Sequence, residues 1–385
     1  MSRTLKLTTV GWALVLVTGY RLATLVATLS FNGAMTALHR RNTGTSVFSW
    51  WDGLWYLRIA EHGYDPHFFQ GSRDFGRQTE AAFPPALAAL MGTTHRLLGI
   101  DITVAGLLWC FVALVAIGVG LVKLIEPDYG RRIALLTLTF LLLWPPAIFF
   151  GMLYQDGITL AGVVWAFVFV RRKQPALAGI ALGIGCLGKL VAAVALLALA
   201  VDYLHTARDD EHRYPKLAVL AAGPVVAIGG WLLYSGLRFH KLTAALDAEH
   251  AWGHELSTPW HSISVSAAAV HNFPPGYRAV LIGDFVAIGL LLVATIYLAV
   301  RKARPAYVVY AATLLLVLTS DGNTSSVGRY VLLAFPMFLA LALAADWLYA
   351  KRRIVAVVAG AVVIGGTVTT QLWLISRFAR YYWAG

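Results

Sequence analysis

The sequence predicts an all-α polytopic membrane protein, and three features support this prediction. Of its 385 residues, 59% are apolar and only 13% are charged, and the mean hydropathy is +0.69. Apolar runs of about 20 residues recur along the chain, and each is long enough to cross a hydrocarbon core about 30 Å thick. Short basic clusters separate the runs. The net charge of +12 therefore indicates topology-setting loops rather than nucleic-acid binding.

The basic clusters predict the orientation of every crossing. By the positive-inside rule all of them face the cytoplasm, so the N-terminus lies inside, the C-terminus lies outside, and the chain crosses about eleven times. The clusters are Arg3/Lys6, Lys123/Arg131/Arg132, Arg171/Arg172/Lys173, Arg208/Arg213/Lys216, Arg301/Lys302/Arg304 and Lys351/Arg352/Arg353.

The first crossing, residues 8–30, is long, carries Arg21 and shows no cleavage site, so we expect a retained helix and not a signal peptide. Residues 175–204 have basic clusters at both ends, which excludes a single crossing. Their thirty residues give about 45 Å of helix, enough for two short helices joined near Gly185 and Gly188, with Lys189 near the outer tip. The other expected crossings are 102–124, 133–150, 157–171, 217–236, 278–300, 305–319, 330–349 and 354–375.

The same parity places two long loops outside, at residues 31–82 and 237–277, and long loops of this kind are often functional. Residues 84–98 are apolar but short and contain His95 and Arg96, so we expect a surface or half-inserted helix. Residues 377–383 form an aromatic and basic segment at the outer surface. The two cysteines, Cys110 and Cys186, lie inside apolar segments, so we expect neither a disulfide nor a thiolate metal site. We expect one domain over 1–385.

Residues 49–64 predict an interfacial helix that holds one carboxylate at the water boundary. Trp51, Trp55 and Ile59 share a helical face, and Trp and Tyr favour the interface. Asp52, with Tyr56 four residues later, is the best candidate for a general base. Alternatively Asp52 belongs to a capping box with Ser49 as N-cap, and the two roles are compatible.

Further polar residues lie on the predicted outer side, each with an alternative. Glu80 is a second candidate base or a solvated loop residue. Tyr154-Gln155-Asp156 offers an amide and a carboxylate for hydroxyl groups, or Asp156 caps the following helix. Lys189 neutralises a phosphate or extends to the lipid headgroups. Arg329, before Tyr330, binds a ligand or a lipid phosphate.

His250 and His254 have a spacing that binds a metal on a helix, but no third ligand is fixed. We expect loop histidines that hydrogen-bond a polar substrate, and we assign no metal site, although a divalent cation remains possible. The sequence contains no P-loop, dinucleotide fingerprint or nucleophile elbow.

Residues Trp51 to Tyr64 resemble the first-loop signature of the GPI mannosyltransferase II (PIG-V-type) family. That signature is Trp-Asp, an aromatic-Leu pair, Ile-Ala and Gly-Tyr. Similar elements follow in order: Glu80-Ala81-Ala82-Phe83-Pro84, Pro145 to Phe150 with Tyr154-Gln155-Asp156, and Arg329-Tyr330 with Phe335-Pro336. Gln155-Asp156 replaces the family's Ser-Glu and one aromatic is missing before Pro84, so the family's GPI acceptor is not carried over.

The resemblance implies a GT-C-type bundle with surface helices in the first external loop and an inverting transfer outside the cytoplasm. The donor would be a polyprenyl-phosphate sugar, typically mannose, and the acceptor a lipid or glycan. The composition suggests a bacterial plasma membrane. We expect Asp52 or Glu80 as base, Lys189, Arg329, Tyr330 and Arg58 at the donor phosphate, and Trp51, Trp55, Tyr56, Tyr154, Gln155, Asp156, His250 and His254 at the acceptor or sugar. The alternatives are a lipid-linked-sugar flippase or other transporter, and a non-catalytic scaffold subunit.

Overall fold

The computed structural model describes residues 7–37, 46–70 and 78–385. Within them the protein is helical apart from one antiparallel pair of short strands, β1 (Phe69–Gln70) and β2 (Gln78–Thr79). Five of the described helices are long and apolar enough to cross a membrane, or up to seven if each of two bent pairs forms one span. The all-helical membrane class predicted from the sequence is confirmed.

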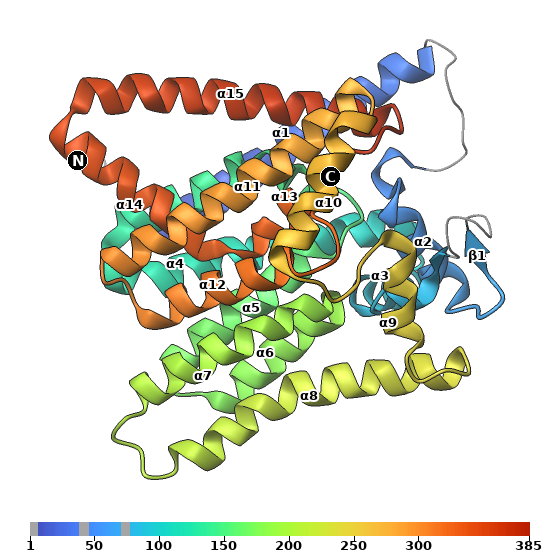
Figure 1. Cartoon of the computed structure of the whole chain (residues 1–385), viewed down its shortest axis with the longest axis horizontal. Coiled ribbons are helices and arrows are strands. Elements are labelled where there is room, and N and C mark those ends of the chain that lie inside the picture. Colours follow the sequence, from blue (N-terminus) through green and yellow to red (C-terminus); the bar gives the residue numbers. More distant parts are fainter. Residues whose placement is uncertain (1–6, 38–45, 71–77) are drawn as a thin grey trace.

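The long helices form one bundle (Figure 1). Phe167 packs against Tyr307, Tyr310 and Phe335 in its main core. The helices of the bundle are α1 (Thr9–Ala37), α4 (Ile102–Leu143), α5 (Asp156–Arg171), α6 (Pro175–Gly188), α7 (Ala195–Thr206), α8 (Arg213–Arg238), α11 (Pro275–Val300), α12 (Pro305–Thr319), α14 (Phe335–Lys351) and α15 (Arg353–Ala379).

One end of the bundle, which we call the basic end, gathers the turns that carry the positive clusters of the described residues (Figure 1). The Arg3/Lys6 cluster lies outside the described residues. Helix α4 turns there at Gly130, whose φ of 79° suits glycine, so its two halves correspond to two predicted crossings. Ion pairs join the elements at this end: Arg171 with Asp128 at 2.5 Å, and Arg304 with Asp202 at 2.5 Å.

Helices α6 and α7 form the predicted pair of short helices. Lys189 lies between them, with η4 (Leu190–Val194) following it, and its Nζ lies 2.7 Å from Asp156 at the start of α5. Asp202, near the end of α7, instead contacts Arg304 at the basic end. The segment therefore runs away from the basic end and returns, with Lys189 at the turn.

The opposite end, which we call the loop end, carries the short elements (Figure 1). They are η1 (Val47–Ser49), α2 (Asp52–His62), η2 (Glu80–Ala82), α3 (Ala86–Leu98), α9 (Ala244–Glu249), η5 (His250–Trp252) and α10 (Pro259–Asn272). Residues 237–277, expected as a loop, are thus largely helical. Trp55 and Phe83 stack at a centroid distance of 5.3 Å in a second core beneath these elements.

The first crossing extends beyond its predicted end at residue 30, because α1 continues to Ala37. Two further predicted helix boundaries are wrong, and prolines explain both. The crossing 133–150 ends at Leu143, because Pro145 and Pro146 have no N–H for the helix, and residues Pro145–Gly151 form η3. The crossing 330–349 begins at Phe335, because Pro336 has no N–H to donate to a preceding turn and is tolerated only in the first turn of a helix. Arg329 therefore lies in a separate short helix, α13 (Val327–Tyr330), followed by η6 (Val331–Leu333) and a bend of 80°.

Candidate active site

An ion pair between Asp52 and Arg329 forms the centre of the candidate site. Asp52 Oδ2 accepts a hydrogen bond from Arg329 Nη1 at 2.8 Å, across 277 positions of sequence. The Asp52 side chain is 27% exposed, whereas that of Arg329 is 8% exposed. A carboxylate that remains accessible to a ligand therefore lies against a buried, permanent positive charge.

The backbone around Trp51 fixes the position of Asp52. Trp51 has a φ of 58°, which is rare outside glycine, and the hydroxyl of Tyr154 accepts a hydrogen bond from Asp52 N at 3.2 Å and donates to Trp50 O at 3.3 Å. The predicted capping box is wrong. Ser49 Oγ donates to Ser46 O, and α2 has no side-chain cap, so the carboxylate of Asp52 is free of that role.

A second buried ion pair lies beside the first. Lys189 Nζ donates to Asp156 Oδ1 at 2.7 Å, and Asp156 is fully buried. The Tyr330 ring centroid lies 4.1 Å from Lys189 Nζ and 5.7 Å from Arg329 Cζ, so both cations lie near one aromatic ring. Lys189 therefore does not extend to the headgroups. Asp156 does not cap α5 either, because it is the first helical residue and Gln155 precedes it without a side-chain cap.

Several buried polar atoms near these pairs have no hydrogen-bond partner. They include both amide atoms of Gln155, which is 1% exposed, and Asp156 Oδ2, Arg329 Nε and Trp51 Nε1. An unsatisfied buried polar group costs about 1–3 kcal/mol, so proteins seldom keep a group of them without a partner. Their number indicates a site for a hydroxylated or anionic ligand.

The segment 249–255, which is part of the second long loop, contacts both the first long loop and the turn before Arg329. His254 Nδ1 forms an ion pair with Asp321 Oδ2 at 2.7 Å, and Asn323 Nδ2 donates to Gly253 O at 2.8 Å. The Trp252 ring contacts Trp55 at a centroid distance of 6.2 Å. His254 thus lies beside the turn that leads to Arg329.

His250 does not share a helical face with His254. Its side chain is exposed, and Gly253, with a φ of 75°, ends the helical turn before His254. The described residues contain no group of three or more His, Cys, Asp or Glu arranged to hold a metal ion. The structure thus does not support the metal interpretation of this histidine pair.

Glu249 is a site residue that the sequence did not single out for chemistry. The pKa of Glu249 is raised from 4.5 to about 7, chiefly by burial; the charges of His254 and Lys189 lower it, and those of Asp321 and Asp52 raise it. Burial opposes the charge of His254, but the Asp321 hydrogen bond and the charges of Asp321 and Glu249 outweigh it and raise the His254 pKa above 6.5. No local motif marks Glu249, because its environment arises from distant segments.

The raised pKa of Glu249 predicts that the free energy of unfolding depends on pH. Between pH 4.5 and about 7 the folded protein retains a proton that the unfolded chain has released, so the free energy of unfolding falls as pH rises through this window and levels above it. Glu249→Gln should remove this contribution. Thermal unfolding of both proteins across the window tests it, and parallel curves would contradict the assignment.

Glu80 and Arg58 form a separate cluster. Arg58 Nε lies 2.8 Å from Glu80 Oε1, Asp65 N donates to Glu80 Oε2 at 2.5 Å, and the Phe68 ring lies 3.4 Å from Arg58 Cζ. The Glu80 side chain is fully buried, and burial raises its pKa although Asp65 and Arg58 lower it. These contacts link α2 to η2 within the first loop. Neither Glu80 nor Arg58 forms a hydrogen bond or an ion pair with Asp52 or Arg329.

We therefore predict that Glu80→Gln mainly affects stability. The neutral amide weakens the hydrogen bond from Asp65 N and removes the charge that pairs with Arg58, at a cost of about 1–3 kcal/mol in the free energy of unfolding. Turnover per folded molecule should change less than about threefold. Thermal unfolding and initial rates measured on one preparation separate the effects, and a loss of turnover without destabilisation would make Glu80 a catalytic base.

The predicted aromatic sugar-binding residues are mostly buried in packing contacts. Trp55, Tyr56 and Tyr154 are at most 6% exposed. Trp51 is partly exposed and stacks on Tyr381 at a centroid distance of 5.1 Å. Of these aromatics, Trp51 is thus best placed to contact a sugar.

Comparison with known proteins identifies related sequences and folds. The family model of glycosyltransferase family 87 matches residues 81–320, a range that includes Asp156, Lys189 and Glu249 but not Asp52 or Arg329. A search of curated protein sequences gave no match.

Two crystal structures of ArnT from Cupriavidus metallidurans share the fold at 18% identity, each covering 90% of this chain and 63% of ArnT. The TM-score is 0.53 for ArnT bound to undecaprenyl phosphate and 0.51 for the apo state. The archaeal oligosaccharyltransferase AglB from Archaeoglobus fulgidus, in complex with an inhibitory peptide and a dolichol-phosphate, has a TM-score of 0.48 at 14% identity, covering 97% of this chain and 56% of AglB. The chain thus spans less than two thirds of these proteins.

Proposed function

The chain belongs to glycosyltransferase family 87, whose members are GT-C membrane glycosyltransferases, and we propose that it transfers mannose from a polyprenyl-phosphate donor to a lipid or glycan acceptor. The observation that carries the proposal is the accessible Asp52 carboxylate beside the buried Arg329. ArnT, which shares the fold, was crystallised with undecaprenyl phosphate, and this supports the donor class. The mannose assignment derives from the PIG-V-type resemblance of the first-loop motif.

Asp52 acts as the general base in this proposal. The acceptor oxygen attacks the anomeric carbon, its proton passes to Asp52, and the bond from that carbon to the phosphate oxygen breaks, with inversion. The electron pair of the broken bond leaves with the lipid phosphate. No covalent sugar–enzyme intermediate forms, so a single carboxylate is sufficient.

Arg329 and Lys189 stabilise the departing phosphate. Arg329 Nε has no partner, and Lys189 has three donors of which Asp156 accepts one. Both cations thus retain free N–H donors that can bind phosphate oxygens. The environment is buried, and charge-assisted hydrogen bonds are strong there. Because Arg329 also binds Asp52, one guanidinium connects the base with the leaving group. Arg58, which is paired with Glu80, has no part in this step.

The sugar would be held beside these groups. The unpartnered amide of Gln155 and the free oxygen of Asp156 offer acceptors and donors for sugar hydroxyls. Trp51, stacked on Tyr381, offers a ring face. His254, fixed by Asp321, approaches from the opposite loop and would contact the acceptor.

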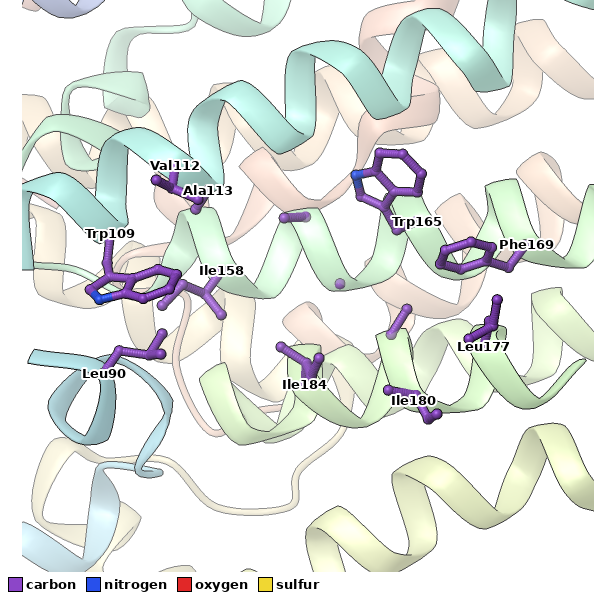
Figure 2. A pocket seen from close by; sticks show the side chains of 13 residues that line it. Leu90, Trp109, Val112, Ala113, Ile158, Trp165, Phe169, Leu177, Ile180 and Ile184 are labelled. Atoms are coloured by element: carbon purple, nitrogen blue, oxygen red, sulfur yellow. The ribbon is translucent and has the colours of Figure 1, made fainter. Parts of the chain in front are cut away.

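An apolar groove offers a path for the lipid tail (Figure 2). It runs along α5 between α4 and α6, with a cavity volume of about 330 Å³, and Ile158 in its lining lies two residues after Asp156. The side chains that line it include Leu90, Trp109, Val112, Trp165, Phe169, Leu177, Ile180 and Ile184. Its position would place a prenyl chain in the bundle with its phosphate near Lys189.

The basic end would face the cytoplasm and the loop end the outside of a bacterial plasma membrane, by the positive-inside rule. The apolar helices, with α4 counted as two and α6 and α7 counted separately, would then supply the expected eleven or so crossings. The transferase site would lie on the non-cytoplasmic side.

Sugar transfer by purified protein in detergent tests the proposal. Radiolabelled polyprenyl-phosphate mannose is mixed with lipid extract from cells that lack the gene, and polyprenyl-phosphate glucose serves as the sugar control. We expect label from the mannose donor in a lipid or glycan product. Absence of transfer with donor movement across proteoliposomes would instead support a flippase, although the described core between the two ends is apolar around Phe167.

A further inference from the structure

We propose that Asp284 is a positioning residue that holds Arg329 against Asp52; the inference rests on the proposed function and extends it to a residue outside the site. Asp284 lies in α11 and is 2% exposed. It touches neither Asp52 nor the expected donor, and it acts through the backbone of the turn before Arg329.

Both hydrogen bonds of the Asp284 carboxylate come from that turn. Its Oδ1 accepts a hydrogen bond from Gly328 N at 2.7 Å, and its Oδ2 accepts one from Ser326 N at 3.2 Å. Ser326 has a φ of 66°, a conformation that costs free energy in a non-glycine residue and requires support from its surroundings. The two hydrogen bonds give that support.

Paired backbone N–H groups in such a turn form a concave site for anions. Here the Asp284 carboxylate fills it, so the turn is not available to the donor phosphate. The Asp284 carboxylate therefore fixes the direction of the chain at Gly328, and Arg329 extends from there toward Asp52.

The turn is held from the other side as well. Trp144 Nε1 donates to Gly328 O at 2.7 Å, and Gln371 Nε2 donates to Leu142 O at 2.7 Å and Trp144 O at 3.0 Å. A Cβ at Gly328 would lie 3.0 Å from Asp284 Oδ1, so a side chain there would crowd the carboxylate by a few tenths of an ångström. Gly328 is thus fixed between α11 and the end of α4.

A carboxylate inside an apolar spanning helix is expensive and usually indicates function. The apolar window of α11 has a mean hydropathy of 2.5, and a threonine or serine at position 284 would fit the helix at lower cost. Only a carboxylate provides two acceptor oxygens for two N–H groups at once. The geometry of the turn explains why this cost is tolerated.

The experiment is a double-mutant cycle between Asp284→Asn and Arg329→Lys, measured as turnover in the transfer assay. Asn replaces one acceptor oxygen with an NH2 group, which cannot accept a hydrogen bond from a backbone N–H, and so it releases one contact of the turn. In the wild-type background we expect turnover to fall about 10²-fold, the loss typical of a 1 Å misplacement. In the Arg329→Lys background the same change should cost less than about twofold, since Asp284 acts through Arg329. Thr295→Val, on the same helix away from the turn, is the matched control and should retain wild-type turnover.

Additive losses in the cycle would overturn the inference, because they would show a general structural role. If Asp284→Asn fails to fold, Gly328→Ala, which crowds the carboxylate, replaces it with the same expected outcomes. Stabilisation of the protein by undecaprenyl phosphate in thermal unfolding gives a readout independent of activity, and both single variants should reduce it. If the wild type is stabilised but transfers no mannose, the proposed function fails and this readout still decides the inference. If the wild type is neither stabilised by undecaprenyl phosphate nor transfers mannose, both the proposed function and the role of Asp284 are wrong.

Discussion

Replacing Asp52 with asparagine should lower the turnover number for sugar transfer by about 10²–10⁴-fold, the usual loss on removing a general base. The amide keeps the size of the side chain and can still accept the hydrogen bond from Arg329, but it cannot take the acceptor proton. Because Asp52 makes no cap to α2, the helix itself does not depend on the carboxylate. The protein should therefore fold normally.

Initial rates with radiolabelled donor, together with thermal unfolding, measure this effect. Glu61→Gln is the matched control, since Glu61 lies on the same helix and its side chain is 42% exposed. It should keep wild-type turnover. Full activity in a folded Asp52→Asn protein would remove Asp52 from the mechanism.

Replacing Arg329 with methionine should lower turnover by about 10²–10³-fold, comparable to the loss of one donor to a developing anion. Methionine fills much of the same volume but donates no hydrogen bond to phosphate and leaves Asp52 without its cation. Arg329→Lys should recover only part of the rate, because an ammonium lacks the planar donors that bind both partners.

The donor concentration dependence shows which state Arg329 stabilises. A lower turnover number with little change in KM indicates contact with the leaving phosphate in the transition state. Arg380→Met, an exposed cation at the loop end, is the control and should behave as wild type. A rise in KM alone would reassign Arg329 to ground-state binding.

Charge and apolar patterning predicted much of the bundle because they report on each segment's environment. The clusters at both ends of 175–204 excluded a single crossing, and the structure has two short helices that turn at Lys189. Crossing 305–319 coincides with α12. Boundaries near Pro145 and Pro336 failed because hydropathy continues through residues that cannot extend a helix.

The site was predictable only where one residue type was conspicuous in its segment. Asp52 among tryptophans and Lys189 in an apolar hairpin could be found in this way. Arg329 and Asp156 were also expected at the site, but their pairing with Asp52 and Lys189 was not, because Arg329 reaches Asp52 only after the chain has folded. The pairing of Asp284 with a turn 42 residues later leaves no local pattern either. The capping box failed for a similar reason, since Ser49 has the right spacing but its hydroxyl binds Ser46.

The central claim is that Asp52 and Arg329 act as one catalytic unit, and a double-mutant cycle tests it most directly. Turnover is measured for the wild type, Asp52→Asn, Arg329→Met and the double variant, each shown to be folded. Residues that act together give non-additive losses. We predict that the turnover of the double variant is no more than about tenfold below that of the less active single variant. Losses that multiply would contradict a coupled pair at the centre of this site.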